Sequence, residues 1–478
     1  MGKMKTKGLS FRKFDLHVHT PASDCFYDKN VTPQQIVDQC LQLGLSAIAI
    51  TDHNTGDWID KVKSVAKGRG LTVFPSVEVT VGDAHNHIIA ILDVGKTTKD
   101  IEVLLIRLEI FPDSFGKKET FSRKSVTEVI EIITGENFNG LAIPAHIDST
   151  NGVFDQMRGN ERKKVIQHSK LLSVEAVNYQ EVSSLLDGND PSYKRKLAVY
   201  QSSDNPCLDQ DGKPDTSGPF SGMHSIDGIG SRYTYFKVDE NITLESLRQC
   251  FIDPDVRIRQ SDVYQESICP YIKSVKISGG FLDNEELVLH CGLNSILGAK
   301  GVGKSLLIEL IRFALNQRSI NTDIAKDHEG KLREKLGQYG KVEIVVSDKT
   351  GRDYQIIRTY DPSENNPVEC MEPSTNEPIN IDIDQLFPVL FLSQMEIMRI
   401  AENPKEQMSF IDRYFDFHRF RNQITNMESE LEELDGTVAE SIRVSKEEKN
   451  LLSQKQTLKF EIDRISIQLQ NPIFDEYQ

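Results

Sequence analysis

Residues 14–20 read FDLHVHT, a short apolar run that ends at two histidines separated by one residue. The same arrangement, an apolar run followed by an imidazole or a carboxylate, recurs along the first half of the chain. It is found at residues 47–53 (AIAITDH), 71–78 (LTVFPSVE), 141–146 (LAIPAH) and 197–204 (LAVYQSSD). Apolar runs of this length, separated by amphipathic stretches, are typical of buried parallel strands that alternate with helices. The sequence therefore predicts an α/β fold.

The positions of the polar residues predict a closed barrel with a metal site. In a β/α barrel, the residues just after the strands converge on one face, where active sites lie. The chain has 11 histidines, and many of them fall in these segments: His17, His19, His53, His85, His87 and His146. A single histidine after a strand is more often structural, so the prediction depends on the joint pattern. Neutral imidazoles gathered with carboxylates are typical of a transition-metal site.

Length and composition restrict the class of protein. At 478 residues the chain is expected to form two or three domains. It has neither an apolar run of the roughly 18–20 residues that cross a bilayer nor a secretory signal at its basic N-terminus. Seven cysteines without a C-x-x-C pair indicate reduced thiols in the cytoplasm. The net charge of −16 argues against nonspecific coating of nucleic acid, although local basic patches remain possible.

In combination, these motifs resemble the PHP (polymerase and histidinol phosphatase) family of metal-dependent phosphoesterases. The resemblance implies a distorted, seven-stranded TIM-like barrel, in a domain that we place at residues 1–262. It also implies two or three divalent ions, Zn, Mn or Fe, which would activate water for in-line attack on a phosphoester. The implied metal ligands are His17, His19, Asp24, His53, Glu78, His87, His146, Asp204 and His224. The catalytic residues among them are His17, His19, Asp24, His53, Glu78, His146 and Asp204, with Asp52 orienting His53.

Two of these assignments leave alternatives. After Glu78, both His85 and His87 are available, and we prefer His87 because it begins the next strand. His224 is separated from Asp204 by an insertion, residues 205–223, that is rich in Gly, Pro and Asp. The insertion lacks apolar periodicity, so we expect a surface loop at the rim of the site. If His224 does not fold back beside Asp204, one metal position is weakened.

A second motif predicts nucleotide binding. Residues 298–305 read GAKGVGKS, which fits G-x-x-x-x-G-K-S. An apolar run that ends at residue 297 precedes it as an expected strand, and residues 306–315 continue as a helix. The glycines let the backbone wrap the phosphates of ATP, Lys304 reaches them, and the Ser305 hydroxyl binds Mg²⁺. The predicted nucleotide-binding residues here are Gly298, Lys300, Gly301, Gly303, Lys304 and Ser305.

The last part of the chain predicts a strand and then a long helix. Residues 389–397 (VLFLSQMEI) look like an apolar strand that ends in Ser-Gln. From about Phe420, apolar residues alternate by three and four, with a phase slip at residues 441–448. This rhythm favours a coiled-coil arm with one stutter. The alternative is a single amphipathic helix packed on the domain.

Residues 270–478 resemble the N-terminal half of an SMC/Rad50-like ATPase head with its outgoing arm. Gln394 matches the glutamine that contacts Mg²⁺ and the hydrolytic water in that family. The resemblance places the head lobe at residues 263–417 and the start of the coiled-coil arm at residues 418–478. We find no L-S-G-G-Q-type signature and no strand that ends in Asp-Glu; residues 342–348 (VEIVVSD) lack the paired acid. We therefore expect little ATP turnover from this chain alone.

Together, the two halves resemble the PHP–SMC-like ATPase fusions of bacterial genomes, some of which are associated with phage defence. They predict a cytoplasmic, metal-dependent phosphoesterase, most plausibly a nuclease acting on DNA or RNA, gated by the ATPase in phage defence or DNA repair. Expected partners are nucleic acid, a second copy in a homo-oligomer, or a chain supplying the C-terminal ATPase half, but no membrane. The alternatives are a small-molecule or nucleotide phosphatase and an ATP-responsive DNA-binding scaffold with a structural metal site. The nuclease prediction rests on architecture alone.

Overall fold

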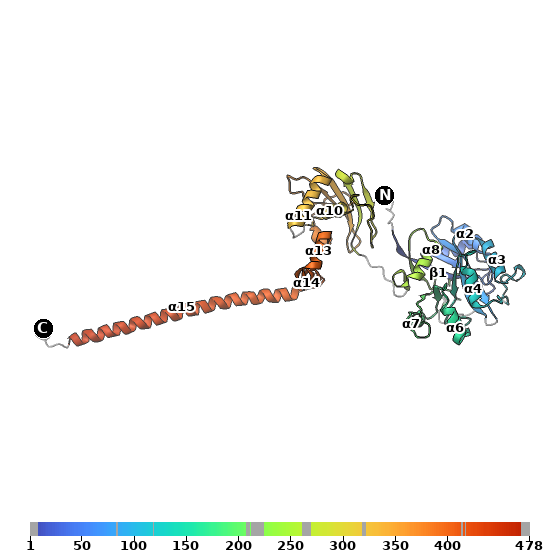
Figure 1. Cartoon of the computed structure of the whole chain (residues 1–478), viewed down its shortest axis with the longest axis horizontal. Helices are drawn as coiled ribbons and strands as arrows, with labels where there is room; N and C mark the ends of the chain where they lie inside the picture. Colours follow the sequence, from blue (N-terminus) through green and yellow to red (C-terminus); the bar gives the residue numbers. More distant parts are fainter. Residues whose placement is uncertain are drawn as a thin grey trace. The chain divides into compact units, whose positions relative to one another are not determined.

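The computed structural model describes residues 8–82, 85–117, 119–206, 211, 224–260, 269–317, 322–412, 414–415 and 417–469 (Figure 1). The chain divides into two compact units. The first combines Met1–Lys304 with Leu336–Phe387, and the second combines Ser305–Lys335 with Pro388–Gln478.

The N-terminal part of the first unit is built on a curled, seven-stranded sheet in the order β5-β4-β3-β2-β1-β8-β9. Its strands are β1 (Ser10–Val18), β2 (Leu45–Ile50), β3 (Thr72–Val81), β4 (Asn86–Ile91), β5 (Leu141–Pro144), β8 (Thr234–Val238) and β9 (Ile258–Gln260). A pair of shorter strands, β6 (Ser173–Glu175) and β7 (Ala198–Tyr200), bridges its two edges. On one side Ile147 N–H donates to the Glu175 carbonyl (2.8 Å), and on the other Gln260 Nε2 donates to the Val199 carbonyl (3.3 Å). The predicted distorted barrel is confirmed.

The strand directions differ from the expected parallel arrangement. Only β1–β2, β2–β3 and β6–β7 pair in parallel, whereas β3–β4, β4–β5, β1–β8 and β8–β9 are antiparallel. β3 ends at Val81 and β4 begins at Asn86, which leaves too few residues for a parallel crossover of a dozen or more. Gly82 and His85 in this turn have φ angles of 68° and 52°, so the chain reverses there as a hairpin.

Helices cover the outside of the sheet, with α2, α3, α4, α6 and α8 arranged around β1 (Figure 1). The helices of this part are α1 (Pro33–Gln42), α2 (Ile59–Ala66), α3 (Thr98–Arg107), η1 (Pro112–Ser114), α4 (Val126–Thr134), α5 (Val153–Gln156), α6 (Gly159–Ile166), α7 (Tyr179–Leu185), α8 (Leu244–Ile252) and α9 (Pro254–Arg257). The side chains of β2 alternate between two buried apolar clusters on opposite faces of the sheet. Ala47 and Ala49 belong to one buried apolar cluster, while Ile48 and Ile50 belong to a second one with the helices, as the two-residue period of a strand requires.

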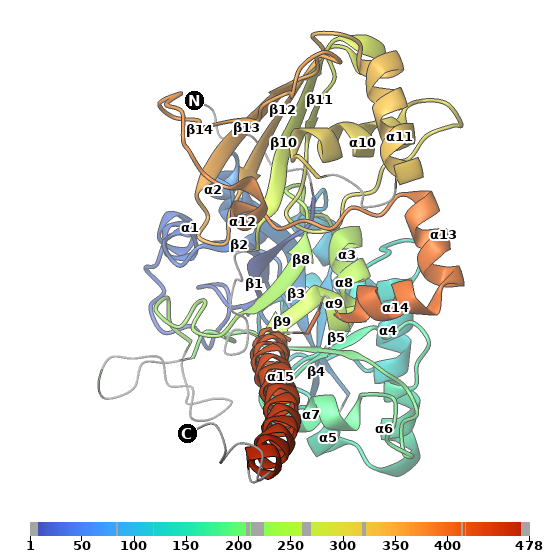
Figure 2. The same cartoon turned by 90° about the vertical axis from the view of Figure 1, so that its left-hand side faces the viewer.

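The rest of the first unit contains an antiparallel sheet in the order β11-β10-β12-β13-β14, whose strands lie side by side in Figure 2. Its elements are β10 (Tyr271–Ser278), η2 (Gly280–Leu282), β11 (Glu286–Val288), β12 (Lys341–Ser347), β13 (Asp353–Thr359), β14 (Glu369–Met371) and α12 (Ile383–Leu386).

The strand predicted before residue 298 is not formed. Residues 293–297 have no regular structure, and Leu293 and Leu297 are 93% and 90% exposed. A buried strand needs neighbouring strands that take up its backbone hydrogen bonds. The sheet in the described part of the chain offers this apolar segment no such neighbour.

The second unit is helical. Its elements are α10 (Lys304–Ala314), α11 (Thr322–Lys331), η3 (Leu332–Leu336), α13 (Gln394–Glu402), α14 (Pro404–Asp412) and α15 (His418–Leu469); Lys304 and Leu336, at the ends of α10 and η3, belong to the first unit. The strand predicted at residues 389–397 is also absent: residues 389–393 have no regular structure, and a helix begins at Gln394. Ser393 and Glu396 form a capping box: Ser393 N–H donates to Glu396 Oε2 (2.6 Å), and Glu396 N–H donates to Ser393 Oγ (3.2 Å). This local motif starts a helix wherever no sheet competes for the segment.

The long helix predicted for the C-terminal part is present as α15, which continues through the phase slip at residues 441–448. Its apolar residues, among them Leu434 and Leu458, are exposed. The coiled coil therefore stays a prediction. Among the described residues, no helix is both long and apolar enough to cross a membrane.

Candidate metal centre

Glu78, in the middle of β3, lies at the centre of the predicted site. Its side chain is buried, with 1% exposure. Histidines from four separate segments place a ring nitrogen 2.8–3.4 Å from its carboxylate oxygens: His17, His19, His53, His87 and His146. The barrel thus brings together side chains that lie far apart in the sequence.

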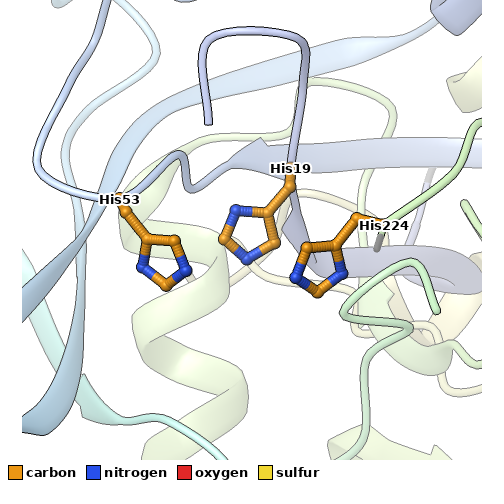
Figure 3. A group of neighbouring side chains, drawn as sticks. All are labelled: His19, His53 and His224. Atoms are coloured by element: carbon orange, nitrogen blue, oxygen red, sulfur yellow. The ribbon is translucent and has the colours of Figure 1, made fainter. Parts of the chain in front are cut away.

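Three groups of side chains could each hold a cation. They are His19, His53 and His224; His17, His19 and Asp204; and His53, Glu78 and His87. Figure 3 shows the first group as a row of rings with His19 in the middle; its ring centroid is 4.7 Å from that of His53 and 4.4 Å from that of His224. The groups share His19 and His53, so they are overlapping parts of one site.

The spacing of the donor atoms fits transition-metal ions. Tetrahedral bonds of 2.0–2.1 Å place two donors roughly 3.3 Å apart. His19 Nε2 lies 3.1 Å from Asp204 Oδ1, and His53 Nδ1 lies 3.1 Å from Glu78 Oε2. His17 Nε2 is buried and has no hydrogen-bond partner among the described residues. A lone pair that faces two carboxylates inside the protein is what a metal ligand requires.

Hydrogen bonds fix the tautomers of two further rings. Ser23 Oγ donates its only proton to Asp52 Oδ1 (2.8 Å), so His19 Nδ1, 3.0 Å from Ser23 Oγ, must be the donor in that contact. His224 Nδ1 lies 2.8 Å from the Asp204 carbonyl, which can only accept. Both rings therefore keep the lone pair of Nε2 for a cation.

The charges around Glu78 also suit a cation. Burial alone would raise the pKa of Glu78, but the surrounding histidines, foremost His87 and His17, hold it well below its ordinary value. Burial lowers the pKa of His53 well below its ordinary value, so this ring is neutral. Burial also lowers the pKa of His19, but Asp204 and Glu78 raise it to about 9. A bound cation would replace the proton between His19 and these carboxylates.

Asp52 acts differently from its predicted role, because its hydrogen bonds do not reach the His53 ring. It accepts from Thr20 N–H (2.7 Å), Thr20 Oγ1 (2.6 Å) and Ser23 Oγ. Through Ser23 it orients His19, while Ser23 also accepts the backbone N–H of His53 (3.1 Å). The prediction linked Asp52 to its sequence neighbour, but the Asp52 carboxylate contacts Thr20 and Ser23 in the segment after β1.

His224 folds back beside Asp204, although the insertion separates them. Its backbone N–H donates to the Cys25 carbonyl (3.0 Å). The start of the insertion is not a surface loop: Asn205 is fully buried, and its Oδ1 accepts the His19 N–H (2.8 Å). The predicted loop at residues 207–210 and 212–223, including Asp209, lies outside the described residues, and Asp211 is exposed.

The remaining predicted ligands are Asp24 and His87, with His85 as the alternative to His87. Asp24 lines the cavity at the site but is exposed and lies outside the three groups. His87, preferred over His85, lies 2.8 Å from Glu78. His85 also lines the cavity, and its ring lies 5.2 Å from that of Phe121. The sequence interpretation missed Glu175 entirely, although it ends the short run Leu171–Val174 in the same way as the other site residues end theirs.

A cavity of about 510 Å³ opens onto the metal groups. Lys117 is the one lysine or arginine in its described lining. The loop of Lys117 is tied to the residue after His53, because Gly116 N–H donates to the Asn54 carbonyl (3.2 Å) and Asn54 Nδ2 donates to the Thr120 carbonyl (2.9 Å). The site therefore combines positions for cations with a cavity of substrate size and one lysine in its lining.

The glycine-rich loop that was predicted to bind nucleotide leads directly into a helix. Gly301 and Gly303 have φ angles of 85° and 92°, which other residues rarely adopt. Lys304 begins α10, and its ammonium donates to the carbonyls of Gly298 (2.8 Å) and Ala299 (2.7 Å). Ser305 is the second residue of α10, Lys300 is exposed, and Gln394 is the exposed first residue of α13.

Comparisons with known proteins identify both halves. The model of the PHP domain family matches residues 15–202, and the model of an AAA domain family matches residues 274–470. A 5'-3' exoribonuclease of Haemophilus influenzae is 25% identical over 146 residues, which is 30% of this chain and 46% of the relative. The chain thus spans about half the length of that curated relative.

One similar solved structure is a two-domain protein from Bacteroides vulgatus that contains a predicted PHP-like metal-dependent phosphoesterase. It is 15% identical, the match covers 60% of this chain and 85% of that chain, and the TM-score is 0.35. An amidohydrolase from Chromobacterium violaceum has 15% identity, coverage of 40% and 86%, and a TM-score of 0.29. The recombination mediator RecF with ATP has 19% identity, coverage of 31% and 39%, and a TM-score of 0.24. The family matches confirm the predicted combination of a PHP domain with an ATPase domain.

Proposed function

We propose that this chain, in which an AAA domain follows a PHP domain, is a divalent-metal-dependent phosphoesterase that acts on nucleic acid. The observation that carries the proposal is the buried carboxylate of Glu78 with five imidazole nitrogens 2.8–3.4 Å away. Bound divalent cations would activate water and neutralise the phosphoryl oxygens during hydrolysis. The histidines and carboxylates of the three groups hold the cations, and Asp52 orients the His19 ring through Ser23.

Three observations support a nucleic-acid substrate. The curated relative is named an exoribonuclease, and its resemblance covers part of this chain. The PHP domain is joined to an ATPase domain, an arrangement suited to an enzyme that works on a polymer. Lys117 gives the cavity a cation that can bind the phosphate next to the one that is hydrolysed. We place the activity in the cytoplasm, in phage defence or DNA repair.

The second candidate is a phosphatase for nucleotides or other small molecules, and the size of the cavity favours it. A volume of about 510 Å³ lies within the range of small-molecule sites. Purified protein with Mn²⁺ should be incubated with single-stranded DNA, RNA and 3'-phosphorylated mononucleotides. Cleavage of the polymers supports the nuclease, whereas turnover of the mononucleotides alone, with the polymers intact, would reject it.

Metal content tests the centre directly. We expect at least two tightly held divalent ions per chain, measured by elemental analysis after dialysis. A chelator should remove activity and lower the melting temperature, because ions bound to the folded state alone stabilise it. Less than one ion per chain would favour the third candidate, an ATP-responsive DNA-binding scaffold whose metal site is structural.

Lys304→Ala tests the coupling between the two domains. Because Lys304 belongs to the nucleotide loop, the variant should keep the basal phosphoesterase activity and lose any response to ATP. Rates with and without ATP and Mg²⁺ are measured, with Lys446→Ala on the exposed α15 as a matched lysine control. If Lys304→Ala loses the basal activity as well while remaining folded, the gating model is wrong.

We also propose that a second polypeptide segment completes the ATPase domain, from another chain or another copy of this one. Two apolar segments, residues 293–297 and 389–393, lack the strand structure that their sequence predicts. Leu293 and Leu297 are nearly fully exposed. Added strands would give both segments their hydrogen-bonding neighbours and bury these side chains. Size-exclusion chromatography with light scattering, with and without ATP, would detect a homo-oligomer.

A further inference from the structure

Glu175, the last residue of β6, is a buried carboxylate that touches two predicted metal ligands from different strands. Its residue exposure is 3%. Its Oε2 lies 2.8 Å from Nδ1 of His17 and accepts the backbone N–H of His146 at 3.1 Å. None of the three possible cation groups includes Glu175.

The His17 ring is held between Glu175 and the metal groups. Its Nδ1 faces Glu175, and its Nε2 faces Glu78 Oε2 (3.2 Å) and Asp204 Oδ1 (3.6 Å). An ionised carboxylate can only accept, so the proton of the neutral ring lies on Nδ1. The lone pair of Nε2 is then directed at the position between Glu78 and Asp204. A carboxylate behind a ligand histidine also makes that ring a stronger donor to a metal.

The second contact of Glu175 is with the backbone of His146. Its backbone has φ of 27°, a strained conformation for a residue other than glycine. Glu175 fixes this segment twice, because its side chain accepts the His146 N–H and its carbonyl accepts the Ile147 N–H (2.8 Å). One side chain therefore sets the position of a ligand from β1 and of a ligand that follows β5.

We propose that Glu175 is a positioning residue of the metal centre, which fixes the tautomer of His17 and the backbone of His146 and so raises the affinity for the cation. It contacts neither the cation nor the substrate. Ser23 behind His19 and the Asp204 carbonyl behind His224 act in the same way, but Glu175 is the charged member of this set. The proposal rests on the proposed function, because it needs a divalent cation at this site.

The test measures metal affinity rather than activity. In Glu175→Gln the side chain keeps its size but loses its charge, and its amide N–H₂ can donate to Nδ1 and favour the other tautomer. The affinity for Zn²⁺ or Mn²⁺, measured by competition with a chelator, is expected to fall by about 10- to 100-fold. The matched control is Asp148→Asn, a nearby carboxylate that accepts Val177 N–H (2.8 Å) and Asn178 N–H (2.7 Å) and no ligand ring. It should bind metal like the wild type.

A spectroscopic measurement on the wild type covers the case in which Glu175→Gln does not fold. Long-range ¹H–¹⁵N correlation spectra of the Zn²⁺-loaded protein should show His17 protonated at Nδ1. Protonation at Nε2, or a folded Glu175→Gln variant with wild-type affinity, would overturn the proposal while leaving the metal centre intact. If the wild type holds no divalent ion, the proposed function fails instead.

Discussion

Alanine in place of His17 is expected to lower phosphoester turnover by roughly a thousand-fold or more. Metal ions supply several kcal/mol of transition-state stabilisation, and each 1.4 kcal/mol or so corresponds to a factor of ten in rate. Nε2 of His17 lies within 3.6 Å of both Glu78 and Asp204, and its loss removes one of the three members of the group His17, His19 and Asp204. The measurement is kcat at saturating Mn²⁺, together with the metal content of the variant.

Because His17 is fully buried, its truncation also leaves a cavity and removes the partner of Glu175, which lowers stability. His53→Ala is the companion variant, since the His53 side chain is 26% exposed and contributes less to packing. It should lose turnover to a similar extent with a smaller fall in melting temperature. His168→Ala, whose ring lies near Glu131 outside the site, should keep wild-type turnover. Folded His17→Ala and His53→Ala proteins with near wild-type rates would place catalysis elsewhere.

Alanine in place of Arg312 is expected to destabilise the helical unit by about 3–5 kcal/mol, the usual effect of removing one partner of a buried ion pair. Arg312 is 2% exposed, and its guanidinium donates to both oxygens of Glu396 at 2.7 and 3.3 Å. Its Nε also lies 3.8 Å from Glu309, which contacts His328 at 2.7 Å. The substitution would leave Glu396 and Glu309 without the cation that they share. Hydrogen exchange of amides in α10 and α13 measures the local loss.

The ion pair between Arg312 and Glu396 should also make the stability of the helical unit depend on pH in the acid range. Burial alone would raise the pKa of Glu396, but the hydrogen bonds from Arg312 and Ser393 lower it to about 2. The stability that this depressed pKa contributes is present above the ordinary glutamate pKa, about 4.3, and is lost as pH falls toward 2. In Arg312→Ala this loss should shift to higher pH. The control is Arg443→Ala, which removes an exposed ion pair with Glu440 on α15 and should change neither the hydrogen exchange of α10 and α13 nor the pH at which stability is lost. Wild-type hydrogen exchange in Arg312→Ala would contradict the predicted destabilisation.

The sequence predicted the barrel and most of its site because the signal is local and repeated. Each of these apolar runs contains a strand, the histidines and acids lie within that strand or just after it, and the barrel brings them together around Glu78. Glu175 escaped notice because its strand is only three residues long and the chain following it carries no histidine motif. The two strands predicted around the nucleotide loop failed for another reason, because a strand depends on neighbours that one segment cannot supply.

By itself, the sequence determined which side chains are available, their spacing relative to the strands, and the glycine-rich loop at residues 298–305 with the helix that follows it. These depend on hydrophobic periodicity and on the conformational freedom of glycine, both of which act over a few residues. Only the tertiary structure decided that Asp52 serves His19, that Asn205 is buried in the site and that Glu175 lies behind His17. These contacts join residues from 29 to 186 positions apart, and only the closure of the barrel brings such residues within hydrogen-bonding distance.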